Sequence, residues 1–211
     1  ALGVIAAAMP ATVSCSANSI NVEKPNNLAM NTSSTMTFKG IDYELASDIN
    51  PNVFTTSYYG YDITSQSIPL KNGGSLYIDG FYNRWEDITS LKLMSCSPYV
   101  TSIGSYFLAF CNELNDLDLS GLNNINFINY GFLYGCCSLQ SLDLYSLTNI
   151  SEICGAFLQG CDSLLELIVP NKSPETFTVN SFQFMEYISP NTLICCNDYL
   201  MQYQKTAPWS D

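Results

Sequence analysis

The sequence contains no histidine among its 211 residues. Without an imidazole, the chain cannot build a Ser-His-Asp triad, a Cys-His dyad or an HExxH zinc site. Basic residues are also scarce, because 7 Lys and Arg stand against 19 Asp and Glu, for a formal net charge of −12. Binding to nucleic acid and electrostatic docking on anionic lipid both depend on basic side chains, so the composition argues against both.

Charged residues make up only 12% of the chain, whereas 47% of the residues are hydrophobic. This apolar content is enough to bury a core, and the length fits one domain with a tail better than several domains. The chain has nine cysteines, but none of them forms a CxxC pair. The spacing therefore excludes a zinc ribbon and a thioredoxin-type motif.

Residues 1–14 are uncharged and rich in small and apolar side chains. They are too short for a bilayer span of ~20 residues and predict a secretory signal that lacks its first residues. The stretch from Thr12 to Cys15 resembles a bacterial lipobox, which implies cleavage before Cys15 and attachment of lipid to it. Ordinary signal cleavage nearby, for example after Ala17, is the alternative. Residues 15–36 are then the lipidated cysteine and a flexible, Asn/Ser/Thr-rich tether.

Residues 78–190 contain a sequence repeat, because residues of the same type recur there at one fixed interval. A period of 20–29 residues with an LxxLxL pattern is typical of leucine-rich repeats, in which stacked units bury a core that one unit cannot bury alone. Three of the columns in register are Phe107, Phe132 and Phe157; Leu108, Leu133 and Leu158; and Cys111, Cys136 and Cys161.

The local patterns predict one short strand and one short helix per unit. Leu117-Asp118-Leu119 alternates as a strand does, whereas Ile128, Phe132 and Cys136 step by four, as on a helix face. We therefore expect an α/β repeat solenoid of the leucine-rich-repeat class with ~25-residue coils. Residues 37–77 fit no repeat and predict an irregular β-rich N-terminal cap, and residues 191–211 predict a C-terminal cap.

The units at residues 125–149 and 150–174 resemble the leucine-rich repeats of BspA-like bacterial surface proteins. The shared pattern is an Ile, an aromatic–aliphatic pair, Gly-Cys and then SLxxLxL. The tail from Ser189 to Cys195, followed by Tyr203 and Trp209, is similar to that family's C-terminal cap, although Cys196 stands where the family often has Pro. The resemblance covers about residues 78–211 and implies a surface-exposed binding protein, often an adhesin.

In a leucine-rich repeat, the strand residues between the leucines point to the concave face. Four acids on adjacent strands would form a negative stripe there, fit for a basic patch on a protein partner, with Tyr145 as an aromatic anchor. The alternative interpretation of this stripe is an acidic face that is merely solvated. A third hypothesis is a calcium site, which needs 6–8 oxygen ligands. The candidate partner-binding residues are Asp116, Asp118, Ser120, Ser141, Asp143, Tyr145 and Glu166.

The column of Cys111, Cys136 and Cys161 is expected to pack as buried thiols beside the Phe column. A disulfide between adjacent coils and a zinc cluster are the alternatives for these sulfurs.

We expect no enzyme, no cofactor and no metal. The sequence predicts a cell-surface or extracellular protein that is anchored in the membrane by lipid and binds an extracellular protein of the host matrix or of a neighbouring cell. The alternative is a structural surface-coat lipoprotein without a specific ligand. A carboxylate pair for glycoside hydrolysis is formally conceivable, but an open face offers no cause for the raised pKa that a general acid needs.

Overall fold

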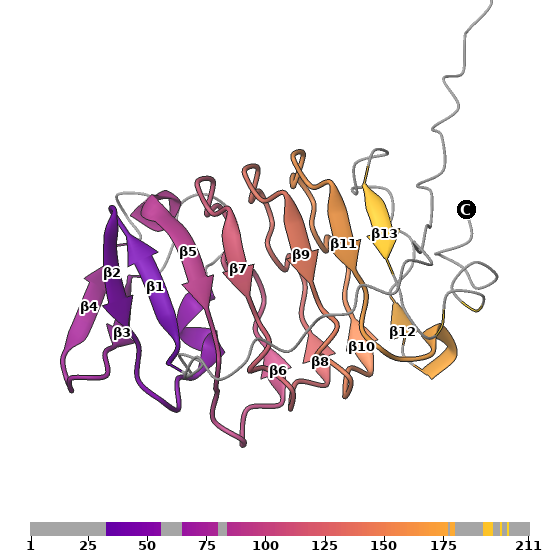
Figure 1. The fold of residues 1–211 in the computed structure, drawn as a ribbon, viewed down its shortest axis with the longest axis horizontal. Coiled ribbons are helices and arrows are strands. Elements are labelled where there is room, and N and C mark those ends of the chain that lie inside the picture. Colours follow the sequence, from indigo (N-terminus) through magenta and orange to yellow (C-terminus); the bar gives the residue numbers. More distant parts are fainter. Residues whose placement is uncertain are drawn as a thin grey trace, which may run out of the picture.

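The computed structural model of the chain is shown in Figure 1. It describes residues 33–55, 65–79, 84–176, 178–179, 192–195, 199 and 202. The predicted signal segment, Cys15, most of the tether and most of the C-terminal cap lie outside the described residues. Between residues 33 and 195, the described part of the chain forms short β-strands and 3-10 turns and contains no α-helix.

Two antiparallel hairpins precede the repeats. Strands β1 (Thr35–Phe38) and β2 (Ile41–Glu44) are joined by Lys39 and Gly40, whose φ angles are 52° and 71°. Two successive positive φ angles match the twist of a two-residue hairpin turn, so this turn sets the register of the pair. Strands β3 (Gln66–Pro69) and β4 (Ser75–Ile78) form the second hairpin.

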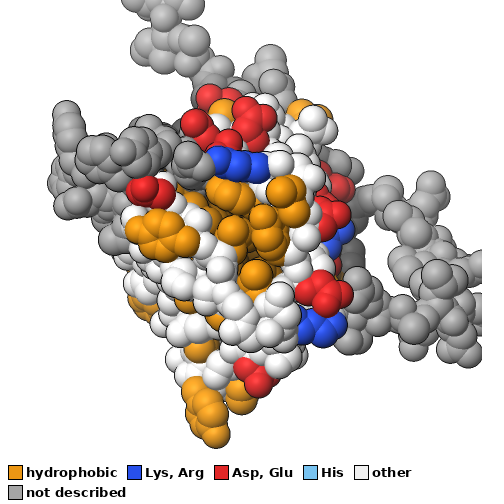
Figure 2. Space-filling model, turned by 90° about the vertical axis from the view of Figure 1, so that its left-hand side faces the viewer, with side chains coloured by type: hydrophobic (Ala, Val, Ile, Leu, Met, Phe, Trp, Pro, Cys, Tyr) orange, Lys and Arg blue, Asp and Glu red, His pale blue; other side chains and the backbone are white. Residues whose placement is uncertain are grey.

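Figure 2 shows this end of the molecule, where β2, β3 and β4 lie. Apolar side chains gather at its centre, and acidic and basic side chains lie around them. Ile41 on β2 and Tyr77 on β4 are 56% and 63% exposed. The N-terminal end therefore differs in chemistry from the polar strand face described below.

The repeats form two columns of short parallel strands, of which the first lies along the upper part of Figure 1 and the second along the lower part. The first column consists of β5 (Ile88–Lys92), β7 (Asp116–Asp118), β9 (Ser141–Asp143), β11 (Glu166–Ile168) and β13 (Leu193–Cys195). The second consists of β6 (Ser102–Ile103), β8 (Phe127–Ile128), β10 (Glu152–Ile153) and β12 (Thr178–Val179). The described residues also form 3-10 turns, namely η1 (Pro51–Phe54), η3 (Arg84–Asp87) and η4 (Pro174–Thr176).

One period of the sequence repeat separates each strand from the equivalent strand of the next repeat. Leu142 on β9 pairs with Leu167 on β11, and Ile128 on β8 pairs with Ile153 on β10. In the first column, the strands belong to two hydrogen-bonded sheets, ordered β2-β1-β5-β7 and β13-β11-β9. In the second column, β6, β8, β10 and β12 form one sheet.

The segments predicted to be helices adopt a different backbone conformation. Gly131, Leu133 and Gly135 have φ angles of 72°, 55° and 76°, and the equivalent residues of the neighbouring repeats also have positive φ angles. Left-handed residues at every second position are incompatible with an α-helix. Their amides bond to adjacent repeats instead: Leu133 donates to the carbonyl of Phe107 at 2.9 Å, and Gly135 donates to the carbonyl of Gln159 at 2.7 Å. These segments therefore form a third ladder between repeats.

The prediction of an α/β leucine-rich-repeat solenoid with one strand and one helix per coil is therefore wrong. The described residues form several small sheets, and no helix accompanies the strands. The step of four from Ile128 to Phe132 and Cys136 suggested a helix, and all three side chains are indeed buried. Here the same spacing of inward side chains arises in a segment where residues with positive and negative φ alternate, and periodicity alone does not distinguish this from a helix.

The core follows the columns of the repeat. Phe107, Phe132 and Phe157 are fully buried and stack in nearly parallel planes, with ring centroids 5.5 and 5.3 Å apart. The ring of Phe54 on η1 meets Phe107 edge to face at 6.3 Å and continues this stack toward the N-terminal hairpins. Hairpins and repeats therefore share one hydrophobic core.

Candidate functional site

The candidate site is the outward side of the first strand column. We call it the strand face and define it by the outward side chains of β1, β2, β5, β7, β9 and β11. Strand alternation produces it, because Leu142 on β9 is 1% exposed whereas its neighbours Ser141 and Asp143 are exposed. The expected strand residues between the leucines thus point to solvent.

Strand pairing places the face residues in two cross-strand rows. Within each sheet the partners follow from the register, and the step from β7 to β9 follows from the sequence repeat. The first row is Asp42, Thr37, Ser90, Asp116, Ser141 and Glu166. The second row is Glu44, Thr35, Lys92, Asp118, Asp143 and Ile168.

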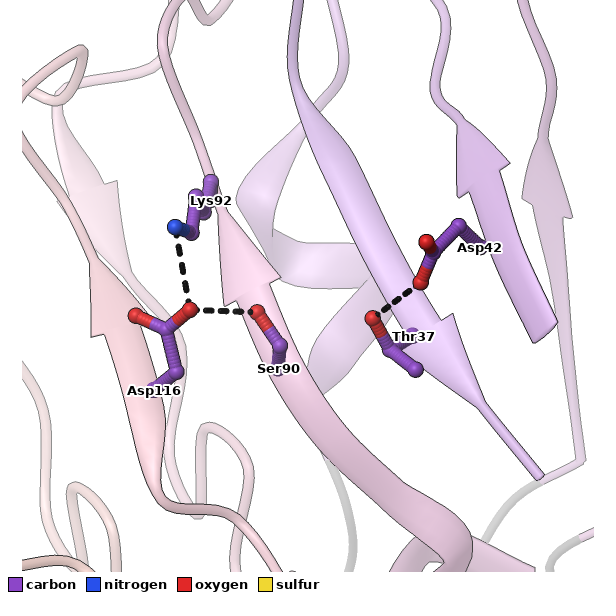
Figure 3. Close-up of polar contacts among 5 residues, drawn as sticks. All are labelled: Thr37, Asp42, Ser90, Lys92 and Asp116. Carbon is purple, nitrogen blue, oxygen red and sulfur yellow. Dashed lines mark hydrogen bonds and ion pairs between the residues drawn. The ribbon is translucent and has the colours of Figure 1, made fainter. Parts of the chain in front are cut away.

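Asp116 is held in place by β5, as Figure 3 shows. Its Oδ2 lies 3.0 Å from the Nζ of Lys92 and accepts a hydrogen bond of 3.0 Å from the hydroxyl of Ser90. In the same row, the hydroxyl of Thr37 donates to Asp42 at 2.6 Å. The ion pair is exposed and contributes little stability, about 0–1 kcal/mol. It does compensate the charge of Asp116, which is therefore not free to attract a partner.

Asp118 and Asp143 occupy equivalent positions of successive repeats, and each turns one oxygen back to its own chain. Oδ1 of Asp118 accepts a bond of 2.9 Å from the amide of Ser120, and Oδ1 of Asp143 accepts one of 2.7 Å from the amide of Tyr145. Short side-chain turns of this kind fix the χ angles of an aspartate. No Lys or Arg of the described residues forms an ion pair with either carboxylate.

Tyr145 is fixed at both ends. Its carbonyl accepts a bond of 3.2 Å from the amide of Asn171, and its hydroxyl accepts one of 3.1 Å from the Nδ2 of the same residue. The side chain is 39% exposed. A tyrosine that is held in one orientation loses little conformational entropy when a partner covers it.

The remaining predicted residues lie on or beside the same surface. Ser141 is the cross-strand partner of Glu166, and Glu166 is half-buried. Ser120 is exposed just after β7, and its hydroxyl approaches the sulfur of Met94 at 3.7 Å. The seven residues predicted from sequence therefore belong to one surface that spans three neighbouring repeats.

The N-terminal half of the strand face was not predicted from the sequence. Ser90 and Lys92 flank Leu91 as Asp116 and Asp118 flank Leu117, so the repeat spacing could have identified both. The other missed residues come from the first hairpin and have no equivalent in the repeat; they are Thr35, Thr37, Asp42 and Glu44.

The cysteine column lies inside the core and away from the strand face. Cys111, Cys136 and Cys161 are free thiols with exposures of 0–2%. The thiols of Cys136 and Cys161 each donate to a leucine carbonyl of the preceding repeat at 3.2 Å. Burial raises the pKa of all three thiols, that of Cys161 to about 12. The described column therefore consists of protonated, unreactive thiols and not of disulfides.

Two further features concern ligands and membranes. Within the parts of the chain that the structure describes, no group of three or more His, Cys, Asp or Glu side chains is arranged to hold a metal ion. The same parts of the chain contain no helix with the length and apolar character needed to cross a bilayer. The predicted lipid-attachment residue, Cys15, lies outside the described residues.

Comparison of the chain with known protein families, with curated proteins and with solved structures finds no match. The resemblance to BspA-like surface proteins therefore stays a prediction from the sequence. Any functional conclusion depends on the residues of the strand face.

Proposed function

We propose that this protein is a cell-surface binding protein that recognises a basic patch on an extracellular protein partner through its strand face. The observation on which the proposal rests is the pair of cross-strand rows, which hold six carboxylates. Two of the six are ion-paired, Asp116 with Lys92 and Glu44 with Lys71, so a basic partner would meet mainly the other acids. Electrostatic complementarity of this kind directs encounter and orientation more than it adds affinity.

The centre of the proposed interface is the β7–β9 region. Asp118 and Asp143 are fixed by their own turns, and each retains one carboxylate oxygen that no turn amide occupies. Tyr145 follows Asp143 and is held by Asn171. Fixed carboxylates beside a fixed aromatic ring are suited to a lysine or arginine, because the cation meets both charge and a π-face.

The extracellular setting is part of the same proposal. It is supported by the signal-like segment 1–14, by the lipobox-like stretch that ends at Cys15 and by the resemblance to BspA-like surface proteins. Cys15 is then the lipid attachment, and the partner is a host matrix protein or a protein of a neighbouring cell.

A structural surface-coat protein without a specific ligand is the second candidate. The observation that favours it is the internal use of the carboxylates, since Asp116 pairs with Lys92 and both Asp118 and Asp143 bind their own turns. Under this hypothesis, the strand face is acidic because its carboxylates make hydrogen bonds and ion pairs within the fold and keep the surface hydrated.

Binding tests with charge-matched variants distinguish the two candidates. The face variant combines Asp118→Asn, Asp143→Asn and Glu166→Gln; asparagine retains the oxygen that accepts the turn amide. The probes are purified extracellular-matrix proteins and a Lys/Arg-rich decapeptide, measured by surface plasmon resonance at low and high salt. We expect the face variant to lose about tenfold in affinity at low salt, because each of the three removed surface charges, one exposed and two half-buried, contributes ~0.2–1 kcal/mol.

The matched control neutralises three exposed acids outside the strand face, namely Asp48, Glu113 and Asp162. It lowers the net negative charge by the same amount and should retain binding. Equal losses in the two variants would mean that only net charge matters and would refute the face as a site. Absence of binding to every probe at low salt would favour the surface-coat candidate.

A further inference from the structure

The strand face is divided between β7 and β9. Both strands are fully described, and they are neighbours in Figure 1, yet each is the last hydrogen-bonded strand of its own sheet. The sheet β2-β1-β5-β7 ends at β7, and the sheet β13-β11-β9 ends at β9. We call the two facing edges the seam.

The repeats on either side show what is missing at the seam. The amide of Leu93 donates to the carbonyl of Asp118 at 2.7 Å, and the amide of Leu144 donates to the carbonyl of Ile168 at 2.8 Å. The equivalent bond at the seam would join the amide of Leu119 to the carbonyl of Asp143. The described residues show no such bond, although the side chain of Leu119 is as buried as those of Leu93 and Leu144.

Packing is also looser at the seam. The central leucine of the strand is 0% exposed at Leu91, 1% at Leu142 and 0% at Leu167. Leu117 on β7 occupies the same column but is only partly buried. An unbonded backbone and a less buried leucine at the same position are two independent signs of a local gap in the sheet.

Charge explains why the gap falls at this place. In the bonded strand pairs β5–β7 and β9–β11, each second-row carboxylate lies opposite a neutral or positively charged side chain. Asp118 faces Lys92, and Asp143 faces Ile168. Across the seam, the repeat would place Asp118 opposite Asp143. Like charges directly opposite each other on adjacent strands are destabilising.

The same two repeats remain bonded elsewhere. Strands β8 and β10 pair in register, and the amide of Cys154 donates to the carbonyl of Ile128 at 2.9 Å. In the third ladder, Gly131 donates to Gly155 at 3.1 Å and Leu158 donates to Phe132 at 3.0 Å. The repeats are therefore joined at two of the three places where their backbones meet.

We propose that the seam is a hinge in the strand face. Two bonded blocks, β1–β2–β5–β7 and β9–β11–β13, open and close about the second strand column and the third ladder. Opening changes the separation of β7 and β9, which bear Asp118 and Asp143, while the aromatic stack stays in place. The face can thus adjust its width without unfolding a repeat, and this inference does not depend on the identity of a partner.

Amide hydrogen exchange of the full chain, followed by NMR, tests the hinge. The Leu119 amide should exchange about 100-fold faster than its equivalents Leu93 and Leu144, because it lacks the bond that they make. The amides of Cys154 and Leu158 should stay as protected as those of Leu93 and Leu144. These five positions separate opening of the seam from loosening of the repeats as a whole.

Two outcomes would overturn the proposal. Equal protection of Leu119, Leu93 and Leu144 would show that the ladder closes in solution and that there is no seam. Fast exchange of Cys154 and Leu158 together with Leu119 would show that the two repeats separate completely, which is local unfolding and not a hinge.

Discussion

Replacing Gly131 with alanine tests how tightly the third ladder is packed. Gly131 has a φ of 72°, and a Cβ at this position would lie 2.4 and 2.5 Å from two ring carbons of Tyr106 in the preceding repeat. Gly40, in the first hairpin turn, has nearly the same φ of 71° but no atom within 4 Å of its Cβ position. Gly40→Ala therefore measures the backbone cost alone, and Gly131→Ala adds the contact.

The expected magnitudes follow from these two terms. A left-handed alanine costs about 1–2 kcal/mol, so Gly40→Ala should destabilise the protein by that amount. Carbon contacts relax only near 3.5–4.0 Å, so the Tyr106 ring must shift by about 1 Å, an overpacking that costs ~1–3 kcal/mol. The shift also disturbs the edge-to-face contacts of Tyr106 with Tyr130 and Tyr134, whose centroids lie at 5.7 and 6.3 Å. Gly131→Ala should therefore cost ~2–5 kcal/mol in total.

The assay is urea denaturation of the wild type, both single variants and Gly131→Ala in a Tyr106→Ala background. Removing the ring should reduce the cost of Gly131→Ala to that of Gly40→Ala, since only the backbone term remains. If Gly131→Ala costs no more than Gly40→Ala while Tyr106 is present, the close approach of the two repeats is wrong. If the cost persists without the ring, the ring is not its cause.

Three further predictions concern other parts of the fold. Gly121→Ala should destabilise the chain by about 3 kcal/mol or more in the same assay, because its Cβ would lie 2.2 Å from the backbone carbon of Met94, which cannot move aside. Asp143→Asn should stabilise the protein by ~0.2–1 kcal/mol and slow exchange at the seam, and Asp162→Asn, off the face, should do neither. Stability should hold below about pH 8.5 and fall above it by ~1.4 kcal/mol per pH unit for each buried thiol, because unfolded thiols ionise there. Denaturation at several alkaline pH values measures this slope, and Cys136→Ala should reduce it by the contribution of one thiol. A free energy of unfolding that does not change with pH would contradict the burial that raises the pKa of Cys161 to about 12.

Several site residues were predictable because strand alternation is a local property. In the strand Ser141–Asp143, Leu142 is buried and its two neighbours are exposed, a pattern that follows from strand alternation alone. The pairing partners were not predictable in the same way. Lys92 neutralises Asp116 only because a parallel ladder places β5 beside β7, and the hairpin residues Thr37 and Asp42 join the row through an antiparallel pairing that no repeat spacing encodes.

The helix prediction failed for a definite physical reason. Phe132 and Cys136 are four residues apart and both buried, which is the pattern of a helix face. The backbone between them is decided by hydrogen bonds to the preceding and following repeats, as when Leu133 donates to Phe107 and Gly135 donates to Gln159. A single repeat in isolation has neither partner, so its sequence contains no local sign of this conformation beyond the glycines.

The sequence by itself determined the period of the repeat, the columns of buried Phe, Leu and Cys, and the acidic character of the chain, because these depend only on which residues recur and at what spacing. The tertiary structure alone decided the backbone of the predicted helices, the neutralisation of Asp116 and the seam between β7 and β9. Each of these depends on contacts between residues of neighbouring repeats, and whether two strands in register attract or repel is settled only when they meet.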